Sequence, residues 1–241
     1  MMLRKAMSSS FRRLAPSVKR RGFIALPQGE AAPVIGGIIG ANVAVYAGWQ
    51  TLDPRTMTRH FTLCADDVLK RPHTLFTGFF SHRDGWHLLG NMMTLFFFGP
   101  EVIYAIGARS FLGLFFGAGS VSSLCEIGSD LSKNSYWKKP RYLGASGAVN
   151  ACVTWSILLN PWRLIFVFAE MIPLPLPAIL YGGAYVSKDL AALFNVRIPY
   201  ISDRAAPGVA HGAHVAGAAL GAIHFFLFRY RPFGGGRFRR F

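Results

Sequence analysis

The chain has 241 residues, of which 52% are apolar and only 15% are charged, and its mean hydropathy is +0.33. A soluble globule of this size needs more polar surface than this composition offers, so the sequence indicates a polytopic membrane protein. The formal net charge of +15 does not indicate nucleic-acid binding, because the basic residues gather at the two ends and in connecting segments rather than along one amphipathic face.

The first 29 residues carry seven basic side chains, several serines, no acidic residue and no long apolar stretch. A secretory signal peptide would need an uninterrupted apolar core, so the composition favours a mitochondrial targeting segment. A basic tail held by anionic lipid headgroups is the alternative. We therefore expect a basic segment at 1–29, a membrane domain at 30–228 and a basic tail at 229–241, located in the mitochondrial inner membrane or, alternatively, another endomembrane.

Six apolar runs are each close to the length of about 20 residues that a helix needs to cross the hydrocarbon. They lie at about 33–49, 85–106, 109–128, 145–160, 176–194 and 207–228. Pro173, Pro175 and Pro177 break helical structure, so 163–173 is predicted to lie on the membrane surface or to re-enter it. The predicted fold is an all-α bundle of six membrane-spanning helices.

An even number of spans places both termini on one side of the membrane, and both termini are basic. The positive-inside bias then assigns that side to the matrix and the segment 50–84 to the opposite compartment. Arg55, Arg59, Lys70 and Arg71 within that segment argue the other way.

The three cysteines, Cys64, Cys125 and Cys152, are far apart and form no CxxC pair. Neither a zinc site nor a disulfide framework is indicated, so we expect thiols. No metal and no other cofactor is expected.

The second predicted span begins with "HLLGN", which places His87 and Asn91 four residues apart. On a helix these side chains lie one above the other, so both can donate hydrogen bonds toward the same point. A clasp between two membrane helices is the alternative, because His and Asn often serve as interhelical donors.

The fourth predicted span begins with "GASGA", residues 144–148. Small residues such as Gly144 let helices approach closely, so a packing motif is one interpretation. If the helix begins here, however, Ser146 lies in its first turn, where backbone N–H groups have no partner within the helix. Those donors can stabilise an oxyanion.

The sixth predicted span contains His214, followed by a stripe of small residues at Gly217 and Gly221. The stripe predicts close packing on another helix, and the small face of the fourth span is the expected partner. Beside Ser146, the imidazole would complete a serine-histidine dyad and accept the hydroxyl proton. A proton relay and a structural hydrogen-bond donor are the alternatives for a membrane histidine.

Together, "HLLGN", "GASGA" and "AHVAG", at the starts of the second, fourth and sixth spans, resemble the rhomboid family of intramembrane serine proteases. The resemblance covers about 34–228, and the basic leader suggests a mitochondrial-type member. It implies that Ser146, at the start of a short central helix, is the nucleophile and that His214 is the base. It also implies an oxyanion hole made of His87, Asn91 and the Ser146 N–H, a bracing role for His82 and a structural role for the Glu101 carboxylate.

Two features depart from the family pattern. Many bacterial members carry a Trp-Arg pair where this chain has His73 and Thr74, so the anchoring of that segment is expected to differ. Some relatives place an aromatic ring against the catalytic histidine where this chain has Asn150. We hypothesise that Asn150 hydrogen-bonds His214 and fixes its tautomer.

No carboxylate lies in the matching motifs, since Asp189 and Asp203 fall outside them, so a dyad without a third member is expected. The resemblance implies substrates with a single membrane-spanning segment, which reach the site sideways past the fifth span, while 195–206 acts as a cap. The other expected partner is the lipid bilayer, and nucleic acid is not. A non-catalytic rhomboid-like protein that binds membrane clients, or a transporter that uses His214 as a proton relay, are the alternatives.

Overall fold

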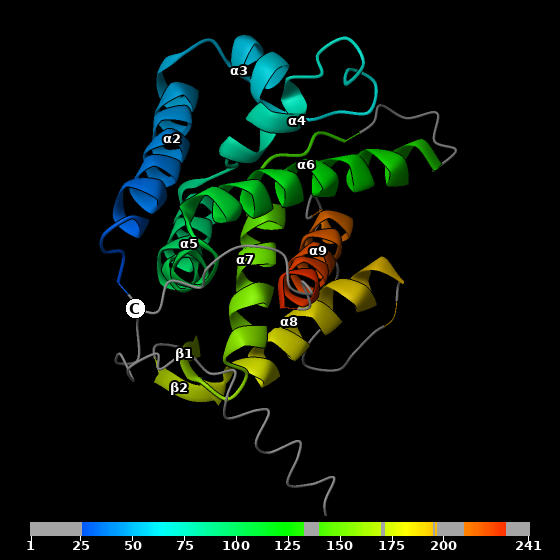
Figure 1. Cartoon of the computed structure of the whole chain (residues 1–241). Coiled ribbons are helices and arrows are strands. Elements are labelled where there is room, and N and C mark those ends of the chain that lie inside the picture. The colour runs from blue at the N-terminus through cyan, green and yellow to red at the C-terminus, as the bar shows by residue number, and fades with distance from the viewer. Residues whose placement is uncertain (1–25, 133–139, 170–171, 195, 197–209, 230–241) are drawn as a thin grey trace, which may run out of the picture.

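The computed structural model describes residues 26–132, 140–169, 172–194, 196 and 210–229 (Figure 1). The predicted targeting segment lies almost wholly outside these residues, as do the predicted cap, apart from residue 196, and the C-terminal tail from 230. The described elements are α2 (Ala31–Thr51), α3 (Pro54–Phe61), α4 (Thr74–Thr77), the 3₁₀ helix η1 (Gly78–Phe80), α5 (Gly85–Ile106), α6 (Ala108–Ser132), α7 (Ser146–Leu159), β1 (Leu164–Ala169), β2 (Ile172–Pro177), α8 (Ala178–Leu193) and α9 (His211–Arg229).

Within the described part of the chain, four helices are long and apolar enough to cross a membrane: α2, α5, α6 and α9. The prediction of an all-α polytopic membrane bundle is confirmed. Each of the six predicted spans corresponds to one helix, but α7 and α8, with 14 and 16 residues, are shorter than a full crossing. The third predicted span is longer than expected, because α6 continues to Ser132.

The segment predicted to lie on the surface or to re-enter the membrane contains most of a β-hairpin, which was not predicted from the sequence. β1 and β2 pair antiparallel, with Leu164 opposite Pro177 and Ala169 opposite Ile172. The prolines of β2 occupy alternate positions, so their missing N–H groups fall on the side of the strand that faces away from β1. A two-stranded ribbon therefore accommodates residues that would break a helix.

The bounds of α5 agree with the predicted span at 85–106, because both ends carry strong local signals. At the start, the Asp84 carboxylate accepts a hydrogen bond from the His87 backbone N–H over 2.8 Å, which caps the helix. At the end, Gly107 has φ = 79°, a conformation that other residues rarely adopt.

The short helix α7 lies at the centre of the bundle, in contact with α5, α6, α8 and α9 (Figure 1). Its small residues allow this position, and Ala148, Ala151 and Cys152 have no exposed surface. α9 packs on it through Gly217 and Gly221, where an added Cβ would overlap the backbone carbonyls of residues 147 and 151. The predicted packing of the small-residue stripe on the fourth span is therefore confirmed.

The segment between α2 and α5, expected only as a loop, is folded onto the bundle by contacts of its own. Leu63 and Tyr142 exchange backbone hydrogen bonds of 2.8 Å, which fasten it to the chain just before α7. The His73 ring lies 3.1 Å, nitrogen to nitrogen, from the His60 ring. At the position of the missing Trp-Arg pair, this segment is thus held by a contact between His60 and His73.

Candidate active site

Ser146 is the first residue of α7, and His214 lies in the first turn of α9. The serine Oγ and the histidine Nε2 are 2.8 Å apart, which is a hydrogen-bond distance. The two residues are 68 positions apart in sequence, and the close contact of α7 with α9 brings them together. This is the geometry that proton transfer from an alcohol to an imidazole requires.

Gly144 forms the turn that leads into α7, and its φ of 127° is accessible to glycine but not to other residues without strain. A Cβ at this position would lie only 2.8 Å from Cε1 of His87 and 3.9 Å from Oγ of Ser146. The absence of a side chain therefore keeps open the space between these two residues, which lie on either side of it.

The predicted oxyanion donors are only partly assembled. The Ser146 N–H belongs to the first turn of α7, where no intrahelical partner exists, and the His87 ring lies across Gly144 from it. The side-chain amide of Asn91 instead donates to the backbone carbonyl of His87 over 2.9 Å. Asn91 is thus hydrogen-bonded within its own helix.

The expectation that no carboxylate orients His214 is wrong. Asp189, on α8, is 1% exposed, and its Oδ2 lies 3.1 Å from Nδ1 of His214. Its other oxygen lies 2.6 Å from Nδ1 of His211. Because the carboxylate is an acceptor, it favours the tautomer with hydrogen on Nδ1 of His214, which leaves Nε2 able to accept the proton of Ser146.

The hypothesis that Asn150 hydrogen-bonds His214 is also wrong, because Ser146 and Asp189 already occupy both ring nitrogens. The side chain of Asn150 lies toward Tyr185 of α8. The Tyr185 ring stacks on His214, with centroids 6.3 Å apart and planes inclined by 26°. The aromatic ring that α7 lacks is therefore supplied by α8.

A crevice of about 190 Å³ opens between α7, α8 and α9 beside the serine-histidine pair. Its walls are mainly apolar, and the polar groups of Asn150, Asp189 and His214 lie among them. We call this cavity the α7–α8 crevice; its other lining residues are Val153, Thr154, Ile157, Leu158, Ile179, Gly182, Gly183, Tyr185, Val186, Val215 and Ala218. It offers an apolar side chain a place next to the reacting groups.

His82, expected to brace the segment before α5, is 2% exposed and its ring lies 4.9 Å from the His87 ring, centroid to centroid. Neither ring nitrogen has a hydrogen-bond partner in the part of the chain that the structure describes. Burial lowers the pKa of His82 to about 4, so the ring is neutral at physiological pH.

Glu101, expected to be structural, lies near the opposite end of α7. Its carboxylate pairs with the Arg163 guanidinium over 2.6 Å and accepts hydrogen bonds from Ser156 and Asn160. These contacts join α5 to the end of α7 and to the chain that enters β1. Glu101 therefore holds three elements together far from the serine.

Among the described residues, Asp189, His211 and His214 are the group that could hold a metal ion, with ligand atoms within 4.8 Å of one another. The two imidazoles are, however, already hydrogen-bonded to the carboxylate. The carboxylate and Nδ1 of each imidazole thus belong to one hydrogen-bonded network, which places a buried acceptor against His214, while Nε2 of His211 has no partner among the described residues.

Two residues of this cluster, Asp189 and His211, were not predicted from the sequence as site residues. Asp189 follows "YVSK" in an otherwise apolar run, and an ionisable residue inside a predicted span is itself a signal of function. His211 precedes His214 by three residues, which places both on one helix face.

Comparison with known proteins agrees with the motifs. Residues 70–231 match the family model described as "Rhomboid domain". The chain is 30% identical over 234 residues to the Arabidopsis thaliana "RHOMBOID-like protein 12, mitochondrial", covering 92% of this chain and 65% of the relative. It is 26% identical over 194 residues to the Saccharomyces cerevisiae "Rhomboid protein 1, mitochondrial", covering 78% and 51%.

A third relative is the Arabidopsis thaliana "Rhomboid-like protein 16, chloroplastic", 30% identical over 178 residues, with 67% of this chain and 55% of the relative covered. The chain thus spans about half to two thirds of the length of these relatives.

Proposed function

Because the chain belongs to the rhomboid family, we propose that it is an intramembrane serine endopeptidase that cleaves membrane-spanning segments of other proteins. The observation that carries the proposal is the 2.8 Å contact between Ser146 Oγ and His214 Nε2 at the start of a buried helix. A purely structural histidine would not need a serine, an open glycine turn and unpaired backbone donors at one point.

In the proposed reaction, Ser146 Oγ attacks the scissile carbonyl while His214 Nε2 accepts the hydroxyl proton. Asp189 holds the Nδ1–H of His214 and stabilises the imidazolium that forms. The same proton then passes to the leaving amine. A water molecule, deprotonated by His214, hydrolyses the acyl-enzyme and restores Ser146.

The developing oxyanion would be held by the Ser146 N–H and by the His87 ring, which lie on either side of Gly144. Asn91 would contribute only after its amide exchanges the hydrogen bond to the His87 carbonyl for one to the substrate. Binding of the substrate would thus complete the oxyanion hole.

The substrate would be a single-span membrane protein with a helix-weakening residue near the cleavage site, because a carbonyl hydrogen-bonded within a helix cannot be attacked readily. The α7–α8 crevice, next to His214, would receive one of its apolar side chains. Lateral access past α8 fits this position, since α8 forms one wall of the crevice.

The proposed location is the mitochondrial inner membrane, with the basic residues at 1–29 as a targeting segment. The composition of that segment and the mitochondrial relatives support it. Fusion of residues 1–29 to a fluorescent reporter tests this part alone, and a reporter that stays outside mitochondria would contradict it.

The test of the activity is covalent labelling by a fluorophosphonate serine-hydrolase probe, together with cleavage of a model single-span protein, in detergent. Ser146→Ala is expected to abolish labelling and to lower cleavage about 10⁴-fold. The matched control is Ser120→Ala, which removes a hydroxyl bonded only to the Phe116 carbonyl of its own helix. If wild type labels no better than Ser146→Ala, the non-catalytic alternative is favoured.

A further inference from the structure

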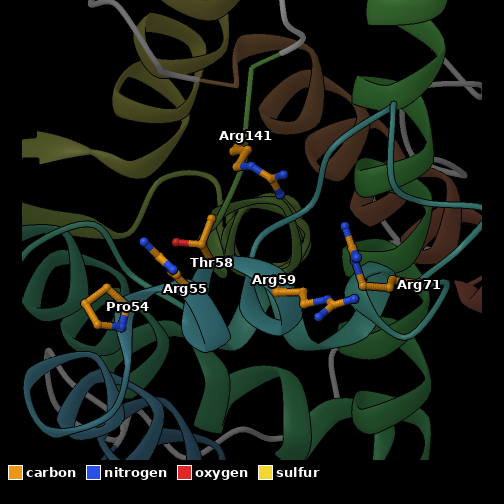
Figure 2. A pocket seen from close by; sticks show the side chains of 6 residues that line it. All are labelled: Pro54, Arg55, Thr58, Arg59, Arg71 and Arg141. Carbon is orange, nitrogen blue, oxygen red and sulfur yellow. The ribbon is translucent and has the colours of Figure 1, made fainter.

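A strongly basic pocket lies away from the active site, between α3 and the chain that leads into α7 (Figure 2). Its volume is about 390 Å³. We call it the arginine pocket; its lining residues are Pro54, Arg55, Thr58, Arg59, Arg71 and Arg141. In Figure 2, Pro54, Arg55, Thr58 and Arg59 lie below Arg141, and Arg71 lies to the right of Arg59.

The pocket carries more positive than negative charge. Arg71 and Arg141 share one carboxylate, Asp67, each over 2.6 Å. Arg55 and Arg59, both exposed, form no ion pair with any residue that the structure describes. The hydrogen bond from Arg141 lowers the pKa of Asp67, so this carboxylate stays ionised but neutralises only part of the charge.

The orientation of α3 fixes the unpaired arginines toward the pocket. Met57 is 1% exposed and anchors the opposite face of the helix. Arg55, Thr58 and Arg59 are spaced three and four residues apart, so they share the outward face. Like charges at this spacing destabilise a helix, and a bound anion would remove that repulsion.

The pocket also lies at the level expected for lipid headgroups. α3 begins three residues after the end of α2, a helix long enough to cross the membrane. Leu52 and Leu69, close in sequence to Arg55 and Arg71, are 57% and 95% exposed. Exposed apolar side chains beside arginines are typical of a surface that sits in the membrane interface.

We propose that the arginine pocket binds the phosphodiester group of an anionic phospholipid. Guanidinium groups match phosphate oxygens with paired hydrogen bonds, and the Thr58 hydroxyl can donate a further one. The inference does not depend on proteolysis, so it applies equally to a chain inactivated by Ser146→Ala. It implies that the segment between α2 and α5 is held to the membrane by lipid as well as by α2.

The test measures binding of phosphatidylglycerol, phosphatidylcholine and inorganic phosphate to the purified full chain in a neutral detergent, by native mass spectrometry and by the shift in unfolding temperature. The wild-type chain is expected to bind phosphatidylglycerol at least tenfold more tightly than it binds phosphatidylcholine or inorganic phosphate. Added salt should weaken the binding of phosphatidylglycerol. The variant Arg55→Gln/Arg59→Gln should bind it at least tenfold more weakly.

The matched control is Lys70→Gln/Arg109→Gln, which removes two exposed charges outside the pocket and should change binding less than twofold. Without lipid, the Arg55→Gln/Arg59→Gln variant should unfold at the wild-type temperature or above it, because the repulsion within α3 is gone. If that double variant does not fold, Arg59→Gln alone should still weaken binding at least threefold.

Equal binding of phosphatidylglycerol by wild type and the pocket variants would overturn the proposal. Equal binding of phosphatidylcholine would overturn it too, because the pocket would then not select negative charge. If inorganic phosphate binds as tightly as phosphatidylglycerol, the pocket holds a soluble anion and the assignment to lipid is wrong.

Discussion

The two ends of α7 both carry polar clusters inside a largely apolar bundle, yet they are built differently. At its end, the Glu101 carboxylate is surrounded by donors from Ser156, Asn160 and Arg163. At its start, Asp189, His214 and Ser146 form a chain of hydrogen bonds that ends at a hydroxyl group facing an open glycine turn.

Under the proposed function, this difference separates a polar network that supports the fold from one that takes part in the reaction. A partly buried carboxylate with donors from three residues contributes rigidity and is costly to break. A series of hydrogen bonds that ends at a hydroxyl group leaves that group free to interact with a substrate. Substitutions in the Asp189 cluster should therefore lower activity, whereas substitutions in the Glu101 cluster should lower the free energy of unfolding.

Among the substitutions that compare the two ends of α7, the largest effect is expected for Asp189→Asn. It should lower kcat about 1000-fold with little change in KM, because an amide can donate to Nδ1 of His214 and so favour the wrong tautomer. Both kcat and KM are measured from the cleavage of a single-span substrate. Asp66→Asn, at an exposed carboxylate, is the control, and partial recovery in Asp189→Glu distinguishes a positioning role from loss of the fold.

Next in size is Glu101→Gln, which should lower the free energy of unfolding by about 3 kcal/mol by leaving Arg163 without its anion. The kcat of the folded fraction should stay close to wild type. Unfolding in mixed micelles checks the first part, with Glu30→Gln, an exposed acid, as the control. A large fall in kcat at unchanged stability would remove the distinction between the two ends.

His82, which lies beside His87 near the start of α7, should also make the stability of the protein sensitive to acid. Its pKa is about 4 in the fold, against about 6.5 unfolded, so below pH 6.5 the unfolded state gains a proton that the folded state does not. Stability should fall by about 2 kcal/mol between pH 7.5 and pH 5. Unfolding measured across this range tests it, and a His82→Phe variant that folds should lose this component.

The smallest effect is expected for Tyr185→Leu, which removes the ring that stacks on His214. A loss of about 1 kcal/mol of packing corresponds to a decrease in kcat of roughly fivefold. Tyr181→Leu is the matched control, because Tyr181 stacks on Tyr185 rather than on the imidazole. Equal effects of the two variants would mean that the contact with His214 has no special role.

Much of this arrangement could be predicted from the sequence because its signals are local. Asp84 and Gly107 mark the two ends of α5, and small residues at Gly147 and Gly217 predict the contact of α7 with α9. The pairing of Ser146 with His214 follows from that contact, together with the family motifs.

The position of Asp189 could not be predicted, because it depends on how α8 packs beside α9 rather than on any local pattern. A lone acid in an apolar run indicates a partner without identifying it. The hairpin was missed for a different reason: prolines at Pro173, Pro175 and Pro177 suggest broken helix, although their alternate spacing also suits an edge strand.

The three groups of the active site do not share one rigid support. Ser146 and His214 ride on helices fastened backbone to backbone at Gly217 and Gly221, whereas Asp189 belongs to α8, which also forms one wall of the α7–α8 crevice. Any displacement of α8 away from α9 would lengthen the contact between Asp189 and His214 and leave the contact between Ser146 and His214 unchanged. If substrate enters past α8 as proposed, the hydrogen bond between His214 and the Asp189 carboxylate would be complete only while α8 is packed against α9.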